Sequence, residues 1–298
     1  MASIILNCPV NIRRSFSEML KGFTQDLGEK TGIDISIKVQ QRPDEPLLQQ
    51  AIEAGEIPDV VIAHAVKLVD LGSEKIKEYF QPLPACFPIR QEMIEKGFVD
   101  PSAYLNTFAI VPFVIIYNRH LIRDEDIPSK WEELIDSKWW GQVTAPFAHH
   151  VVSRLALDFI KYHFPDRYEG FMANTYFSKS PQETVIAVDE GRYPLGIMNI
   201  SFAKFSRNKN VGFIWPEEGA LCSPQVMVFK KDIDQRLLTV GDFLMSANMQ
   251  EFFCKQDFIP AYSEIEISPE VLKNKCNFWW EGWDDYFNVL AKKTIKGK

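Results

Sequence analysis

Two side chains that could bind or react with a small molecule directly follow expected strands. Cys8 comes after the apolar run Ser3–Asn7, and His64 comes after Asp59–Ala63. A thiol at a helix N-terminus can be a soft metal ligand or a nucleophile, because that position lowers its pKa. Neutral imidazole binds metals, and charged imidazole pairs with anions. A buried, inert thiol and a packed histidine are the alternatives, and the sequence leaves both open.

The backbone next to these side chains suggests an anion site. Pro9, Val10 and Asn11 follow Cys8 and lead into an expected helix, and Ala65 follows His64 in the same way. Free N–H groups at the start of a helix can hold an anion. The alternative is a capped helix without a ligand. We therefore predict ligand contacts at Cys8, Pro9, Val10, His64 and Ala65.

Two adjacent histidines begin a further expected helix. Phe147, His149 and His150 precede the apolar positions of that helix. Neighbouring residues do not share a helix face, so at most one histidine is expected to meet a ligand. We predict His149, together with Phe147. The alternative is that both histidines are solvated.

Alternating strands and helices would position these residues. Apolar runs at 3–7, 33–39 and 59–63 read as strands, and the stretches between them show helical spacing. This β-α-β-α-β order predicts an α/β fold with a parallel sheet and right-handed crossovers. Ligands of such sheets bind outside the carboxyl ends of the strands. Further along, Ser129 with Glu132 three residues later predicts a helix start.

Two proline-bearing strands predict how the domains are organised. Phe108–Asn118 contains Pro112 and Ser223–Lys230 contains Pro224, and central ladder strands tolerate proline badly. We therefore expect both segments to connect two lobes as hinge strands. Residues 1–114 with 226–298 form lobe 1 of this prediction, and residues 115–225 form lobe 2. A ligand cleft is expected between the lobes.

Composition narrows the classes of function. The 298 residues carry a net charge of −7, which argues against a nucleic-acid partner, and 46% are hydrophobic, as in globular proteins. The longest apolar stretch, 108–117, is half a membrane span, so no membrane insertion is expected. No basic leader precedes the first apolar run. We expect a periplasmic or extracellular location if a leader was removed, and a cytoplasmic one otherwise.

Known catalytic motifs are missing from the sequence. It has no GxSxG, HExxH, Walker or GxGxxG motif, and its five cysteines form no CxxC pair. We therefore expect no enzyme and no cofactor. The alternative is an enzyme that uses Cys8, His64 and His149 as nucleophile and base. The tryptophan clusters at 139–140 and 279–283 are expected to pack rather than stack on a ligand.

Several longer segments together resemble a known family. They are IPDVVIAHA (57–65), QPLPACFP (81–88), AIVPFVIIYNRHLI (109–122), IPSKWEELIDSKWWGQVTAPFA (127–148), TVIAVDEGRYPLGIMNISFAKF (184–205), WPEEGA (215–220) and DFLMSANMQEFFCKQDFIPAY (242–262). The chain resembles type II periplasmic solute-binding proteins of ABC transporters, nearest the ferric-iron-binding branch. The resemblance implies two α/β lobes, a two-strand hinge and capture of a solute by closure of the cleft, in the manner of a Venus flytrap.

The resemblance also implies which positions meet the solute. His64 stands where iron-binding members place an acidic residue, and Ser201-Phe202 stands where they place tandem tyrosines. Ferric iron prefers anionic oxygen ligands, so direct ferric binding is not expected. Asn199, Ser201 and Phe202 suit hydrogen bonds and apolar contact with an organic ligand.

Two turn carboxylates complete the candidate site. Glu217 and Glu218 would counter a cationic ligand, and the alternative is that they are solvated. We expect an organic anion first, a metal or metal chelate second and a cation third. The protein is expected to act as a monomer in ABC-type import or sensing, with a permease as partner. Whether a metal is bound stays open.

Overall fold

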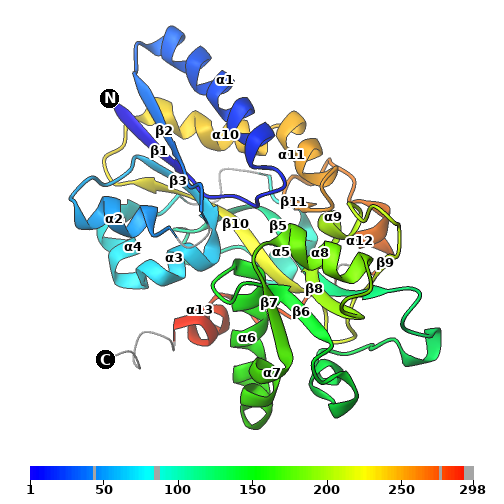
Figure 1. Cartoon of the computed structure of the whole chain (residues 1–298). Coiled ribbons are helices and arrows are strands. Elements are labelled where there is room, and N and C mark those ends of the chain that lie inside the picture. The colour runs from blue at the N-terminus through cyan, green and yellow to red at the C-terminus, as the bar shows by residue number, and fades with distance from the viewer. Residues whose placement is uncertain (43–44, 84–87, 275–276, 292–298) are drawn as a thin grey trace. The chain divides into compact units, whose positions relative to one another are not determined.

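The protein is described by a computed structural model that covers residues 1–42, 45–83, 88–274 and 277–291 (Figure 1). Cys86, Cys276 and the lysines of the basic C-terminal tail lie outside the described residues, as does part of the QPLPACFP segment. The chain divides into two compact units. Unit 1 consists of residues 1–110, 223–268 and 281–298, and unit 2 consists of residues 111–222 and 269–280.

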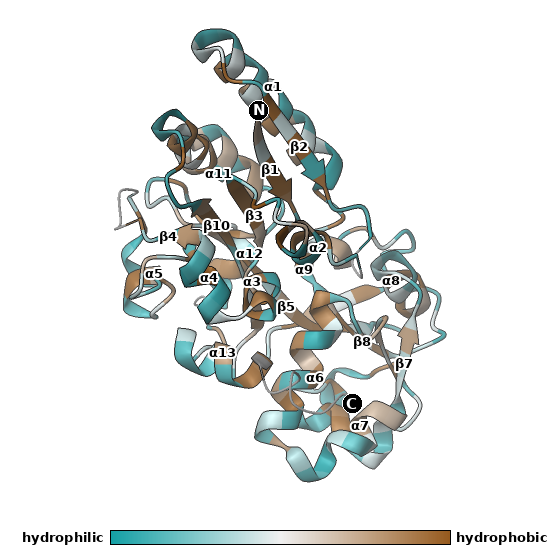
Figure 2. Ribbon diagram, turned by 90° about the vertical axis from the view of Figure 1, so that its left-hand side faces the viewer, coloured by the Kyte–Doolittle hydropathy of each residue, from teal (hydrophilic) through white to brown (hydrophobic). Residues whose placement is uncertain are grey.

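Unit 1 contains the expected parallel sheet. Strand β1 (Ala2–Leu6) lies between β2 (Ile35–Val39) and β3 (Val60–His64) and pairs in parallel with both. Strand β10 (Leu221–Lys230) pairs with β3 in the antiparallel direction, and the order continues to β5 (Asn106–Asn118). Figure 2 colours β1 and β3 as apolar, which fits central strands that are buried on both faces.

The helices of unit 1 pack on this sheet. Phe16 of the first helix meets Phe253 with ring centroids 5.4 Å apart, and Phe253 meets Phe108 at 5.3 Å. Gly32 ends that helix in the left-handed conformation, with φ of 73°. The helices are α1 (Arg13–Thr31), α2 (Leu47–Glu53), α3 (Ala65–Leu71), α4 (Ser73–Tyr79), α5 (Gln91–Glu95), α10 (Thr239–Met245), α11 (Ala247–Cys254) and α13 (Trp283–Ala291), with the 3-10 turn η5 (Gln235–Leu238) and the short strands β4 (Phe80–Gln81) and β11 (Ile259–Pro260).

Unit 2 is a mixed sheet. Strand β6 (Val143–Pro146) pairs in parallel with β7 (Thr175–Ser178) and β8 (Leu195–Asn199). The carboxyl-terminal part of β5 pairs antiparallel with β8 and with β9 (Val211–Ile214). The helical segments of this unit are α6 (Val151–His163), α7 (Tyr168–Asn174), α8 (Pro181–Asp189), α9 (Ile200–Ala203) and α12 (Pro269–Lys273), with the 3-10 turns η1 (Asp124–Asp126), η2 (Glu132–Ile135), η3 (Ser137–Trp139) and η4 (Pro165–Arg167).

The prediction of a helix that starts at Ser129 is wrong. Only the 3-10 turn η2 forms there. Ser129 bonds to Glu133, through its N–H (3.3 Å) and its hydroxyl (3.0 Å), and not to Glu132. The local capping signal is present, but the two short 3-10 turns η2 and η3 replace a continuous helix.

Strand β5 runs unbroken through Pro112 and changes partners there. Ile110 pairs with Ile259 of β11, and Phe113 pairs with Asn199 of β8. The chain passes from unit 1 to unit 2 within β5, between residues 110 and 111, and returns to unit 1 within β10, between residues 222 and 223. The predicted lobe boundaries at 114/115 and 225/226 stay a prediction. Residues 269–280, which that prediction gave to lobe 1, belong to unit 2.

No helix among the described residues is both long and apolar enough to span a bilayer.

Candidate functional site

The carboxyl ends of β1 and β3 bring the predicted residues of unit 1 to one edge of its sheet. Leu6 pairs with Ile62, and the Asn7 N–H donates to the Ile62 carbonyl at 2.8 Å. Continuing this register places Cys8 level with His64. On the other side of β3, His64 pairs with Gln225 of β10. We call Asn7–Asn11, His64–Ala65 and Ser223–Gln225 the strand-end site of unit 1.

His64 is buried in this site and held by two side chains. Its Nδ1 lies 2.9 Å from Ser223 Oγ and 2.7 Å from Gln225 Nε2, and its exposure is 5%. Gln225 Nε2 also donates to the Ser223 carbonyl at 3.2 Å, which fixes the orientation of the amide. This orientation favours a hydrogen bond from the Gln225 amide to Nδ1, and with it the tautomer that carries the imidazole proton on Nε2. Of the two predicted forms of His64, the geometry favours the neutral imidazole.

Cys8 is a protonated thiol, which matches the inert buried thiol and not the metal ligand or nucleophile that the sequence also allows. Burial raises the pKa of Cys8 to about 12, and the opposing charge of Arg13 is the smaller effect. A nucleophilic cysteine needs its thiolate, which this environment disfavours. The enzyme alternative thus loses its nucleophile, and the structure agrees with an inert buried thiol.

No side chain caps the N-terminus of α1, and its first turn holds no acidic residue. The N–H groups of Cys8, Val10 and Asn11 have no acceptor within the described part of the chain. By contrast, Ser180 caps α8 and His150 caps α6. The Ile12 and Arg13 N–H groups donate to the Pro9 and Val10 carbonyls at 3.2 and 3.4 Å, so the turn satisfies part of the helix start itself. The turn keeps other donors that suit an anion, and the choice between an anion site and a helix start without a ligand stays a prediction.

A second group of predicted residues lies at the carboxyl ends of two parallel strands of unit 2. Phe147 directly follows β6, which ends at Pro146, and Asn199 is the last residue of β8. Asn199 is buried and its Oδ1 accepts from the Phe202 N–H at 3.0 Å, so it caps α9. Ser201 and Phe202 are buried in the first turn of α9. Their role toward a ligand stays a prediction.

The adjacent histidines differ in environment. His149 is exposed. His150 Nδ1 accepts from the Val152 N–H at 3.3 Å, and its ring lies edge-on to Phe147 with centroids 5.5 Å apart. His150 is thus engaged in capping, and His149 remains the candidate of the two.

The turn carboxylates also differ. Glu218 accepts from the Trp131 N–H at 3.2 and 3.3 Å, which fixes the segment before η2. Glu217 is exposed and forms a surface ion pair with Lys130 at 3.7 Å. Such pairs contribute little to stability. Glu217 matches the solvated alternative in its exposure, and its ligand role stays a prediction.

The tryptophans mostly pack, as the sequence suggests. Trp139 and Trp283 are buried, and Trp279 packs on His163 with centroids 4.4 Å apart. Trp140 differs and is 66% exposed.

No group of three or more His, Cys, Asp or Glu side chains is arranged to hold a metal ion among the residues that the structure describes.

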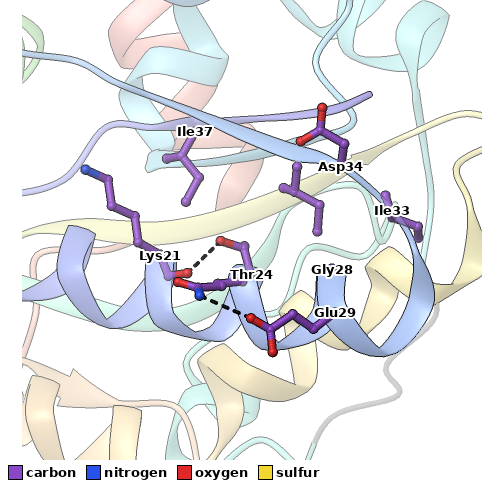
Figure 3. A pocket seen from close by; sticks show the side chains of 9 residues that line it. Lys21, Thr24, Gly28, Glu29, Ile33, Asp34 and Ile37 are labelled. Carbon is purple, nitrogen blue, oxygen red and sulfur yellow. Dashed lines mark hydrogen bonds between the residues drawn. The ribbon is translucent and has the colours of Figure 1, made fainter.

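Two hollows of unit 1 lie outside the predicted site. One, of about 480 Å³, runs between α1 and the edge strand β2 and is drawn in Figure 3, where Lys21, Thr24 and Glu29 line the helix side and Asp34 and Ile37 line the opposite side. The other, of about 510 Å³, is bordered by α4, the 100–105 loop and α13. None of the predicted ligand-binding residues lines either hollow.

Sequence reasoning missed Ser223 and Gln225. Both lie in a strand that was recognised, but the partner strand of β10 is far away in sequence. Polar side chains at 223 and 225, on one face of an otherwise apolar strand, were the available signal.

Comparison with solved structures shows the fold. A ferric binding protein from Campylobacter jejuni matches with a TM-score of 0.74 and 16% identity, over 98% of this chain and 95% of that chain. A Trichodesmium protein (FutA) in complex with iron and citrate matches with a TM-score of 0.70 and 16% identity, over 98% of this chain and 95% of that chain. A two-component system protein described as mediating signal transduction matches with a TM-score of 0.73 and 15% identity, over 97% of this chain and 99% of that chain. The fold is thus the two-lobed α/β fold of type II periplasmic binding proteins.

Comparison by sequence shows the family. No curated protein matches the chain. Residues 55–288, well over half of the sequence, match the bacterial extracellular solute-binding protein family. The chain belongs to the family of bacterial extracellular solute-binding proteins.

Proposed function

We propose that this protein is a receptor for a small organic anion, with a metal chelate as the second choice of solute. It acts as a monomer outside the cytoplasm and delivers its solute to an ABC-type permease or to a sensor. The family supports solute binding. One structural relative is a complex with iron and citrate, and another is a two-component system protein of signal transduction. These two relatives motivate the chelate and the sensing role.

One observation carries the choice of an anion: the uncapped start of α1 in the strand-end site of unit 1. The protein is acidic overall, yet the turn and first helical residues, 7–14, contain no carboxylate and carry Arg13, while Arg14 is exposed and paired with Glu18. The helix dipole adds partial positive charge at the same point. An anion is the solute that these groups favour.

The other side chains of the strand-end site of unit 1 are neutral in this arrangement: His64 accepts at Nδ1, and Cys8 is a protonated thiol. Unit 2, taken by itself, offers the polar side chains of Asn199 and Ser201 and the apolar side chains of Phe147 and Phe202 at its own strand ends. A bare ferric ion prefers anionic oxygens, so these neutral groups favour an organic anion, or iron that is already chelated.

A thermal-shift screen tests the proposal. The purified protein is screened against carboxylates, oxyanions, sugar phosphates, metals, metal–citrate complexes, amino acids and polyamines. A ligand at a hundred times its Kd stabilises by about 2.7 kcal/mol, which raises Tm by at least a few degrees.

Variants make the screen specific. We expect His64→Ala to remove the shift with the active anion, and His120→Ala, which changes an exposed histidine, to keep it. NMR spectra of the solute should show it unchanged after incubation, because binding involves no turnover. A shift only with cations or amines, or conversion of the solute, would contradict the proposal.

A further inference from the structure

The turn that joins β1 to α1 buries hydrogen-bond acceptors that no protein donor reaches. Asn7 is 9% exposed, and its Oδ1 is buried without a partner among the described residues. Asn11 Oδ1 is buried in the same way, while its Nδ2 reaches Gln256 Oε1 at 3.5 Å. Buried polar atoms in proteins are normally hydrogen-bonded, so two such atoms four residues apart point to a missing donor.

The same turn also holds donors without acceptors in the described ranges. These are the N–H groups of Cys8, Val10 and Asn11, and the buried Nε of Arg13. Arg13 is otherwise fixed by its Nη1, which donates to the Gln41 carbonyl at 2.6 Å. The 19-residue helix α1 adds its dipole to these donors. Donors that suit negative charge and neutral acceptors therefore occur within one short segment.

We infer that the solute is an oxyanion that carries a hydroxyl group beside its charge. The charged oxygens meet the N–H groups at the start of α1, and the hydroxyl donates to Asn7 Oδ1. This inference rests on the proposed function, because it names the chemistry of the solute at the same site. It assigns Asn7 as a specificity-determining residue.

A hydroxyl suits the acceptors better than an ammonium group does. A buried ammonium needs an anionic partner, and residues 7–14 contain no carboxylate. The two asparagine oxygens are neutral acceptors, which satisfy a neutral donor. Amino acids are therefore disfavoured at this turn, and hydroxyl-bearing anions are favoured.

Two kinds of solute share this chemistry, and paired probes distinguish them. L-Malate carries a hydroxyl beside a carboxylate, and succinate is the same diacid without it. Hydrogen phosphate carries an O–H at neutral pH, and sulfate does not. Each pair compares similar anions with and without the donor, so the difference within a pair reports on the acceptor at Asn7.

Isothermal titration calorimetry with these four anions tests the inference on the full chain. We expect at least one donor-bearing anion to bind about tenfold more tightly than its partner. Preference for malate assigns a hydroxycarboxylate, and preference for phosphate assigns a phosphate group. Asn7→Leu, which keeps the size of the side chain, should reduce the ratio of the two affinities within that pair to about one. Asn288→Ala, at an exposed position of α13, should leave it unchanged.

A second variant tests the anion at the helix start. Asn11→Asp places a carboxylate beside the free N–H groups. It should therefore lower the affinity for all four anions by about tenfold or more while the fold is retained.

Equal binding within both pairs in the wild-type protein would overturn the inference without any variant. So would a preference that survives Asn7→Leu, or no binding of any of the four anions. In each case the proposed function stands if another anion of the thermal-shift panel binds in a His64-dependent way. The proposed function itself fails if no anion of the thermal-shift panel binds.

Discussion

The side-chain amide nitrogen of Gln225 lies 2.7 Å from the Nδ1 atom of His64. The residues are 161 positions apart and meet because β10 pairs with β3. Since the same amide nitrogen donates to the Ser223 carbonyl, it presents a hydrogen to His64 rather than a lone pair. A proton on Nδ1 would point at that hydrogen, so the contact favours the tautomer of His64 with its proton on Nε2.

The first prediction concerns the tautomer of His64. Nitrogen-15 NMR of the imidazole at neutral pH should show Nδ1 unprotonated and Nε2 protonated. Gln225→Glu replaces the donor with a carboxylate, which stabilises the charged imidazole, so both nitrogens should become protonated. The exposed control Gln235→Glu should leave the signals of His64 unchanged. A protonated Nδ1 in the wild-type protein would refute this account of the pair.

Cys8 should be almost inert toward thiol reagents in the folded protein. With a pKa of about 12, only about one thiol in ten thousand is ionised at pH 8. Cys254 is more exposed and should react faster, although burial and nearby acidic charge also raise its pKa. Iodoacetamide labelling followed by peptide mass spectrometry measures both rates. Equal labelling of the two cysteines under native conditions would show that Cys8 is accessible or ionised.

Gly219 should not tolerate a side chain. Its φ is 113°, and an added Cβ would lie 2.4 Å from the Phe278 carbonyl carbon and 2.5 Å from the Trp279 nitrogen. We expect Gly219→Ala to lower the free energy of unfolding by about 3 kcal/mol or more.

Gly55→Ala is the matched control for this substitution. Gly55 also has positive φ, but nothing lies within 4 Å of the added atom. Gly55→Ala should lower the free energy of unfolding by about 1 kcal/mol. Urea unfolding of both variants measures the difference, and similar costs would contradict the close approach at Gly219.

Asp189 should stabilise unit 2 in a pH-dependent way. Burial by itself raises the pKa of this carboxyl group, but hydrogen bonds from the Asn208, Asn210 and Arg207 N–H groups and from Ser206 Oγ together lower it. A lowered folded-state pKa means that the stabilisation is present above the unfolded value near 4, and is lost as pH falls through the folded value.

Asp189→Asn tests this linkage. The substitution should cost about 2 kcal/mol at pH 7, because hydrogen bonds to a charged acceptor are lost. The difference from the wild-type protein should shrink as pH falls below 4. Urea unfolding at several pH values measures it. A cost that does not change with pH would show that the charge of Asp189 contributes nothing.

The sequence predicted elements that depend on local pattern. The strands before Cys8 and His64 and the helix that contains Phe16 all follow from short-range periodicity, and all form. The parallel pairing of β1 with β2 and β3 also follows, because β-α-β order restricts the topology.

Features that depend on distant residues were not predictable. The contact of His64 with Gln225 requires the register between β3 and β10, which one sequence does not specify. The pKa of Cys8 depends on how deeply the packed core buries it, not on its position beside a helix. The missing cap of α1 becomes visible only when each N–H group is matched with an acceptor. Local signals therefore located the candidate site, whereas tertiary packing determined its chemistry.

Calorimetric titration of the wild-type protein with the strongest anion of the thermal-shift panel tests the central claim most directly. The account predicts one anion bound per chain, about tenfold or greater weakening in His64→Ala, and unchanged binding in His120→Ala. Binding that is equal in all three proteins would contradict it, because the anion would then bind outside the strand-end site.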